Sequence, residues 1–129
     1  MTARHSALLL GIGLAIWIAG TIYYEFRGPA VLETTSLRYW ADFVLSPVLS
    51  AVVCIIILRA LHVPAPAWAS AALLLALPGM FGEAVLLSNF AALMPKLQPA
   101  SGARYAALLF AAYALFLSTA EVVTLRAAR

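Results

Sequence analysis

Four apolar stretches, separated by short polar or proline-containing segments, dominate this chain of 129 residues. They cover residues 7–24, 41–61, 68–94 and 105–125, and each reaches or approaches the roughly 20 residues that a membrane-spanning α-helix needs. Hydrophobic residues make up 65% of the chain and charged residues 10%, so a soluble fold would expose large apolar patches. The sequence therefore predicts one integral membrane domain over residues 1–129, an all-α four-helix transmembrane bundle.

The segments between the apolar stretches contain residues that interrupt helices. Gly28-Pro29, Pro64 and Pro66, and the stretch 95–102 each mark a predicted turn. The last two connections are short, which favours antiparallel neighbours and an up-down topology. Arg4 and His5 precede the first apolar stretch, but that stretch is long and lacks a convincing cleavage site, so we expect a retained helix.

Charge sets the predicted orientation only weakly. The 8 Lys and Arg residues divide equally between the two sides of a four-span protein. The first loop also carries Glu25 and Glu33, and we expect both termini to be cytoplasmic. Aromatic residues gather at the boundaries on the opposite side, as in an interfacial belt: Tyr23, Tyr24, Tyr39, Trp40 and Tyr105.

Glu83 is a carboxylic acid near the middle of the third apolar stretch, directly after the sequence Leu77-Pro78-Gly79-Met80. A charge at bilayer depth is costly and usually faces the bundle interior. Pro78 lacks an amide hydrogen, so Pro78 and Gly79 predict a kink in this helix. A neutral Glu83 that ties the kinked helix to its neighbours is one interpretation; a proton- or cation-binding carboxylate is the other.

Three other residues lie at a depth similar to that of Glu83. Trp17 is near the centre of the first stretch, Ser50 of the second and Tyr113 of the fourth. Trp17 is expected to pack within the bundle, to line a pocket or to face lipid. Together with Glu83, these residues form the candidate intramembrane site for a proton or ligand.

The first loop is the longest and most polar connection. Arg27, Glu33 and Arg38 make it the candidate contact for a polar partner or for lipid headgroups. Residues 34–36 also suit the N-cap of the second helix.

Several classes of function find no support in the sequence. Cys54 is the only cysteine, and both histidines lie at predicted boundaries, so we expect no metal site, no intramolecular disulfide and no haem. No Ser-His or Cys-His pair shares a depth in the membrane, and no block of basic residues resembles a nucleic-acid footprint. The sequence predicts neither an enzyme nor a cofactor.

The second half of the chain resembles a family of small four-helix bacterial membrane proteins known only as a domain of unknown function. The resemblance rests on Leu77-Pro78-Gly79-Met80, the acid Glu83, Pro95 and Tyr113-Ala114. The acidic position is more often Asp in that family. The resemblance implies a bacterial inner-membrane protein and draws attention to Glu83, but it implies no activity.

Three hypotheses for the function follow. The first is a non-catalytic membrane protein that self-associates or serves as an accessory subunit of a larger membrane complex. The second is a small homo-oligomeric, proton-coupled transporter that uses Glu83. The third is a lipid- or quinone-binding protein. All three have membrane lipids as neighbours.

Overall fold

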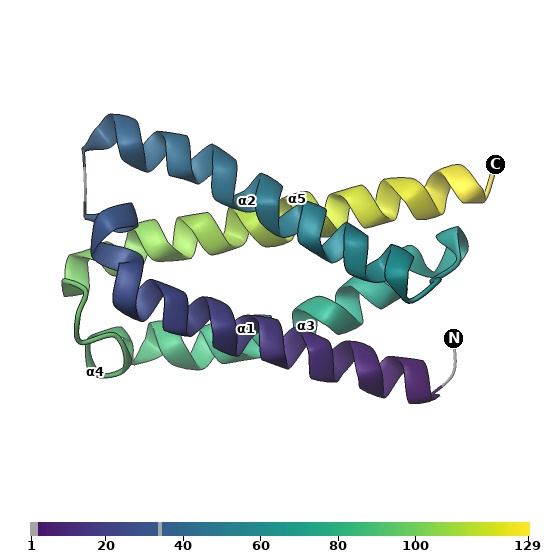
Figure 1. The fold of residues 1–129 in the computed structure, drawn as a ribbon, viewed down its shortest axis with the longest axis horizontal. Coiled ribbons are helices and arrows are strands. Elements are labelled where there is room, and N and C mark those ends of the chain that lie inside the picture. The colour runs from purple at the N-terminus through teal and green to yellow at the C-terminus, as the bar shows by residue number, and fades with distance from the viewer. Residues whose placement is uncertain (1–2, 34) are drawn as a thin grey trace.

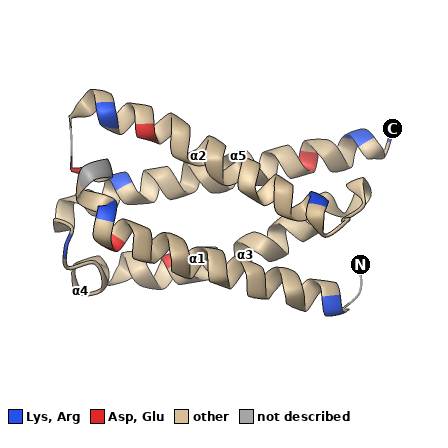
Figure 2. Cartoon of the chain, in the orientation of Figure 1, with Lys and Arg blue, Asp and Glu red and all other residues tan. Residues whose placement is uncertain are grey.

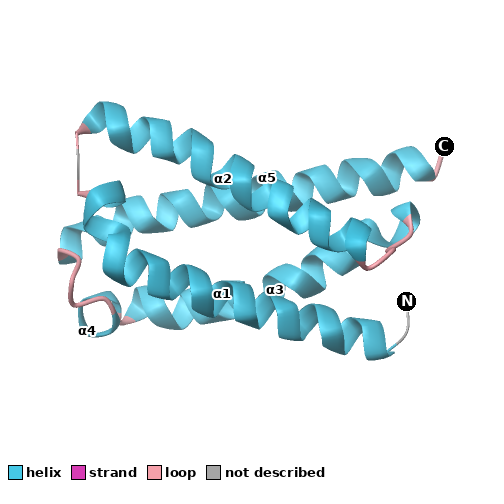
Figure 3. Cartoon of the chain, in the orientation of Figure 1, coloured by secondary structure: helices cyan, strands magenta, loops and turns pink. Residues whose placement is uncertain are grey.

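The computed structural model describes residues 3–33 and 35–129. Four long helices account for most of it: α1 (Ala3–Leu32), α2 (Ser36–Ala60), α3 (Trp68–Ser88) and α5 (Gly102–Ala127). A short helix α4 (Phe90–Leu93) and two 3-10 turns, η1 (Ala65–Ala67) and η2 (Pro99–Ser101), lie in the connections (Figure 3). Among the described residues, four helices are long and apolar enough to cross a membrane, which makes this a multi-pass membrane protein.

The long helices alternate in direction along the chain, and both termini lie at one end of the bundle (Figure 1). This confirms the predicted all-α four-helix bundle. Lys, Arg, Asp and Glu gather mainly toward the two ends, whereas the middle of each helix is almost free of them (Figure 2). Charged residues at the ends and an apolar middle match a bilayer with two aqueous interfaces.

The helices pack in two pairs. α1 lies along α3 and α2 lies along α5, each pair running in parallel, and the antiparallel contact of α3 with α5 joins the pairs. α2 and α3 are joined by a short hairpin but touch at few positions, so the expectation that they are close neighbours is wrong. Beyond the hairpin α2 instead packs on α5, where the small Ala51 and Ala120 bring Leu58 and Phe116 into one buried cluster.

The first helix is longer than predicted, because it begins at Ala3 and continues through Gly28-Pro29 to Leu32. Pro29 lies in the final turn, and its carbonyl still accepts a 3.1 Å hydrogen bond from the Glu33 amide. Proline removes one amide donor but leaves its own carbonyl able to accept. A proline at this position therefore does not end the helix, contrary to our expectation of a turn at Gly28-Pro29.

The third helix is shorter than predicted. It passes through Pro78 without a break but ends at Ser88, and Asn89 leaves the helical conformation at φ −127° and ψ 37°. Ser88 Oγ donates to the Ala84 carbonyl at 2.6 Å, and Asn89 Nδ2 donates to the Val85 carbonyl at 3.0 Å. Side chains that bond to the nearby backbone compete with helix propagation. The predicted continuous helix over 68–94 is therefore wrong in its last turn and a half.

Polar side chains fix both ends of the bundle. Thr35 is the N-cap of α2 and accepts from the Arg38 amide at 3.4 Å, within the predicted capping segment; residue 34 lies outside the described residues. At the opposite end, Thr124 Oγ1 accepts from the Ala69 amide at 2.9 Å and donates to the Ala65 carbonyl at 3.2 Å. Thr124 thereby ties the end of α5 to the start of α3.

Two hydrophobic clusters fill the bundle, one toward each end. The first surrounds Leu9, Leu58 and Trp68, near the chain termini and the α2–α3 hairpin. The second surrounds Tyr39 and Tyr105, near the first loop and α4. Because the two clusters occupy the ends, the middle of the bundle is where an interior space remains.

Candidate functional site

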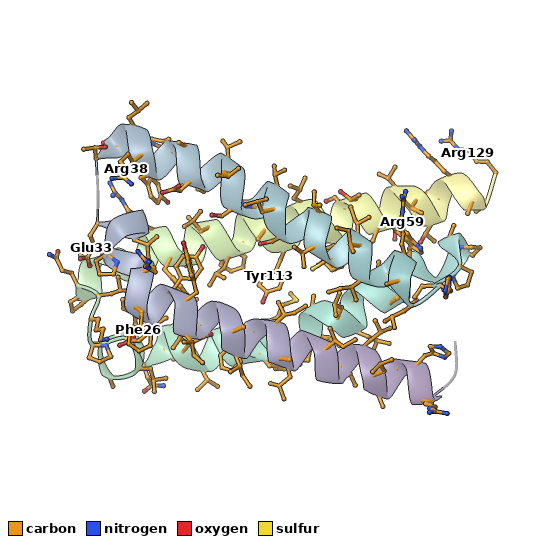
Figure 4. All side chains as sticks on the ribbon, in the orientation of Figure 1. Phe26, Glu33, Arg38, Arg59, Tyr113 and Arg129 are labelled. Atoms are coloured by element: carbon orange, nitrogen blue, oxygen red, sulfur yellow. The ribbon has the colours of Figure 1, made fainter. Side chains whose placement is uncertain are left out.

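A cavity of about 160 Å³ lies between the α1–α3 pair and the α2–α5 pair. Most of its lining is apolar, with a few polar groups that converge from different helices. Its principal lining residues are Gly13, Trp17, Thr21, Tyr24, Ser46, Ser50, Cys54, Gly79, Glu83, Tyr105, Tyr113 and Phe116. On one side of the cavity, α1 and α2 meet at few positions. Figure 4 shows the Tyr113 side chain directed from α5 toward the space between the pairs.

Glu83 supplies the carboxyl group of this cavity and is only 6% exposed. Its Oε1 accepts a hydrogen bond of 2.8 Å from the indole Nε1 of Trp17. Its Oε2 is buried and makes no hydrogen bond of ordinary length, although the Tyr105 hydroxyl lies near this carboxyl group. Buried polar atoms almost always have partners, so an unsatisfied carboxyl oxygen at a cavity wall indicates a place where a donor is received.

Two glycines of α3 bring aromatic side chains close to Glu83. A Cβ at Gly82 would collide with the indole ring of Trp17, and a Cβ at Gly79 would collide with the hydroxyl of Tyr113. The two side chains therefore occupy the space that other residues at these positions would fill. The segment from Gly79 to Glu83 thus supplies both the carboxyl group and the room for the rings beside it.

Close contact between α1 and α3 depends on another glycine. A Cβ at Gly13 would strike the backbone carbonyl of Leu75, so only glycine permits this approach of the two helices. Small residues allow such contacts between membrane helices, where packing rather than hydrophobicity drives association. Gly13 therefore holds α1 close enough for Trp17, one turn further on, to reach Glu83.

Further polar groups complete the lining. Thr21 Oγ1 is buried without a hydrogen-bond partner, and the Tyr105 hydroxyl lies near both Thr21 and Glu83. Tyr24 stacks edge-to-face on Tyr105 at 5.1 Å between ring centroids and approaches Ser46 of α2. The lining residues include no Lys, Arg or His, so the carboxyl group faces hydroxyls and rings but no basic side chain of this chain.

The structure brings the four residues of the predicted intramembrane site to one cavity. Trp17 and Glu83 line it and share a hydrogen bond, Tyr113 lines it with its hydroxyl beside Gly79, and Ser50 lines it from α2 with a more exposed side chain. Gly79 is buried against Tyr113, and Pro78 lies one residue before it within α3.

Sequence reasoning missed Thr21, Tyr24, Gly82 and Tyr105. Thr21 and Tyr24 follow Trp17 by four and seven positions, which places all three on one face of α1. That spacing was visible in the sequence, but several other faces of α1 are equally rich in small and apolar residues. Only the contact with α3 identifies which face is directed inward.

The first connection is not the long polar loop that the sequence predicted, because Arg27 lies in α1, Arg38 lies in α2, and only residues 33–35 separate the two helices. Glu33 Oε1 accepts hydrogen bonds from the Gln98 amide at 2.5 Å and from Ser101 Oγ at 2.9 Å. This carboxylate therefore fixes the turn before α5. Arg27 and Arg38 are exposed and remain available to an outside partner.

Within residues 3–33 and 35–129, no three His, Cys, Asp or Glu side chains gather closely enough to hold a metal ion.

Comparison with known proteins gives one match. Residues 31–127 match the model of a family of unknown function, DUF5367, and the chain belongs to this family. The matched region begins in the last turn of α1 and contains Ser50, Glu83 and Tyr113, whereas Trp17 lies outside it. No curated protein and no solved structure matches the chain.

Proposed function

We propose that this protein is a small proton-coupled carrier of the bacterial inner membrane, with Glu83 as the group that holds either a proton or the solute. It performs no catalytic step, and its termini face the cytoplasm. The carrier works as a homo-oligomer, as the chain's small size suggests.

The unpartnered Oε2 of Glu83 is the observation that carries this proposal. Trp17 fixes one oxygen of the carboxyl group, while the other has no partner at the cavity wall. A carboxyl group inside a membrane protein is by default a candidate for a functional role. In the free protein, a bound proton keeps the Glu83 carboxyl group neutral within the membrane. A bound solute takes the place of that proton and offers a hydrogen-bond donor to the carboxylate.

The pairing of the helices supports transport rather than static binding. Each parallel pair is closely packed within itself, and the cavity lies between the pairs. Many transporters hold substrate near the bilayer midplane and expose it alternately by rocking one bundle against another. Rocking of the α1–α3 pair against the α2–α5 pair would open this cavity without breaking either pair.

Proton movement in proteoliposomes tests the carrier function. Wild-type protein and the Glu83→Gln variant are reconstituted with a trapped pH dye, and benzylammonium or benzyl alcohol is added outside. We expect at least one solute to change the internal pH faster in wild-type vesicles than in Glu83→Gln vesicles. Passive leak is equal in both, so the difference in rate reports transport that depends on Glu83. Identical traces for both proteins with both solutes would overturn the proposal.

A second function is a self-associating or accessory protein. Gly11, Ala15 and Ala19 form an exposed face of small residues on α1, and a Cβ at Gly11 would meet nothing within 4 Å. Small residues at this spacing favour close helix–helix contact in membranes. Native mass spectrometry after gentle extraction distinguishes copies of this chain alone from a complex with other proteins.

A third function is lipid or quinone binding. A cavity of about 160 Å³ accommodates a ring-sized group but not a whole lipid. Lipid or quinone retained in stoichiometric amount after extraction would favour this function over the carrier.

A further inference from the structure

The cavity has the chemistry of a receptor for positive charge. Its one carboxyl group, that of Glu83, meets no basic side chain of the described lining. Hydroxyl groups of Thr21, Ser46 and Ser50 add acceptor oxygens on the α1 and α2 sides. The carboxyl group lacks a donor for Oε2 and, when ionised, a positive charge nearby. A ligand with an N–H donor and a positive charge would supply both.

Aromatic rings add to this preference. Trp17 and Tyr24 reach the cavity from α1, and Tyr105, Tyr113 and Phe116 reach it from α5. Aromatic rings attract cations through their quadrupole, most strongly where water is excluded. An ordinary apolar pocket for a neutral ligand would need the rings but would gain nothing from a buried, unpaired carboxyl oxygen.

We propose that the solute is a small organic cation with an N–H donor, which binds at Glu83 in exchange for one proton. This inference rests on the proposed carrier function and names its substrate class. When the cavity is free, the O–H proton of Glu83 keeps the carboxyl group neutral. When the cation binds, that proton leaves to water and an N–H of the cation donates to Oε2. The net charge inside the membrane is zero in both states, so neither state carries the cost of an isolated charge.

The size of the cavity limits the solute. A cavity of about 150 Å³ lined by apolar side chains is known to hold a benzene ring, and this one measures about 160 Å³. The ligand therefore has one ring or a comparable number of carbon atoms. Larger cations require the helix pairs to separate.

Glu83 is the group that exchanges its proton here, and the other titratable side chains at the cavity are weak acids. Tyr24 faces it from α1, Cys54 from α2, and Tyr105 and Tyr113 from α5. Each of these residues is neutral under ordinary conditions. None competes with Glu83 for the positive charge of the ligand.

Titration calorimetry with a matched pair of ligands tests the substrate class. Benzylammonium and benzyl alcohol share a ring and a methylene group and differ in charge. We expect wild-type protein to bind benzylammonium at least about tenfold more tightly than benzyl alcohol. We expect Glu83→Gln to lose this preference and Glu83→Asp to keep most of it. Heats measured in two buffers of different ionisation enthalpy should report release of about one proton for each benzylammonium bound.

The possible outcomes separate the cation assignment from the carrier function on which it rests. Equal binding of the two ligands, or a preference that survives in Glu83→Gln, would overturn the cation assignment. If benzyl alcohol also moved protons in a Glu83-dependent manner, the carrier function would stand while the substrate class fell. Absence of binding by either ligand to wild-type protein would overturn the cation assignment as well. Size-exclusion chromatography shows whether Glu83→Gln is folded, and Glu83→Asp provides the comparison if it is not.

Discussion

The indole Nε1 of Trp17 in α1 donates a 2.8 Å hydrogen bond to Oε1 of Glu83 in α3, across 66 positions of the sequence. This bond joins two helices deep in the bundle and fixes one side of the carboxyl group. It leaves Oε2 of the same carboxyl group buried without a hydrogen-bond partner.

Removal of the indole donor should destabilise the bundle. Trp17→Phe keeps an aromatic ring against Gly82 but leaves Oε1 of Glu83 buried without a partner. The expected loss is about 1 to 3 kcal/mol of stability, the usual cost of an unsatisfied buried group. Thermal unfolding in detergent measures it, with Trp40→Phe as the control because Trp40 is exposed and does not line the cavity. Equal melting temperatures for the two variants would show that the bond contributes nothing.

The glycines of α3 should tolerate no side chain. Gly82→Ala places a methyl group against the Trp17 ring, and overpacking of this kind costs about 1 to 3 kcal/mol. Gly11→Ala is the matched control, since a Cβ there meets nothing within 4 Å. We expect Gly82→Ala to lower the melting temperature and Gly11→Ala to leave it unchanged or raise it slightly. A Gly82→Ala variant as stable as wild type would contradict the packing of the Trp17 ring against Gly82.

The cavity can be examined through Cys54, the only thiol of the chain. Cys54 is half-buried and lines the cavity, so a small maleimide that enters should label it. Ala112→Phe fills part of the cavity and should slow labelling several-fold, because Ala112 belongs to the lining. Ala114→Phe adds the same ring to an exposed position of α5 and should have little effect. Similar labelling rates in the two variants would mean that the reagent reaches Cys54 by another route.

Thr124 should hold the end of α5 to the start of α3. Thr124→Val removes the hydroxyl that bonds to the Ala69 amide and the Ala65 carbonyl, at an expected cost of about 1 kcal/mol or somewhat more. Thr119→Val is the control, because the Thr119 hydroxyl bonds only to the Leu115 carbonyl of its own helix at 2.7 Å. Thermal unfolding of both variants tests this difference, and a larger loss in Thr119→Val would contradict the assignment.

The sequence was sufficient for the number of spans and for the inward position of Glu83, because both depend on the cost of polar groups in hydrocarbon. It was insufficient for the pairing of the helices. In lipid both the inner and the outer face of a helix are apolar, so hydropathy does not show which face meets which neighbour. The close packing of α1 on α3 depends on the absence of a Cβ at Gly13, where the Leu75 carbonyl oxygen lies. Hydropathy does not detect such a contact.

The helix ends also include some that the sequence predicts and others that it does not. The N-cap at Thr35 was predictable, because a hydroxyl before a helix has a local role. The continuation through Pro29 and the break at Asn89 were not, since each depends on which local hydrogen bonds prevail in the folded bundle. Thr21 escaped notice because an isolated threonine in an apolar helix most often bonds to its own backbone, and here it does not.

Infrared difference spectroscopy of Glu83 tests the central claim most directly. A protonated carboxyl group has a C=O stretching band that is absent from the carboxylate, and Glu83→Gln identifies the band that belongs to this residue. We predict that wild-type protein in lipid shows this band when no ligand is present and loses it when benzylammonium saturates the cavity, while benzyl alcohol leaves it in place. A Glu83 band that persists with saturating benzylammonium would contradict the exchange of a proton for the solute.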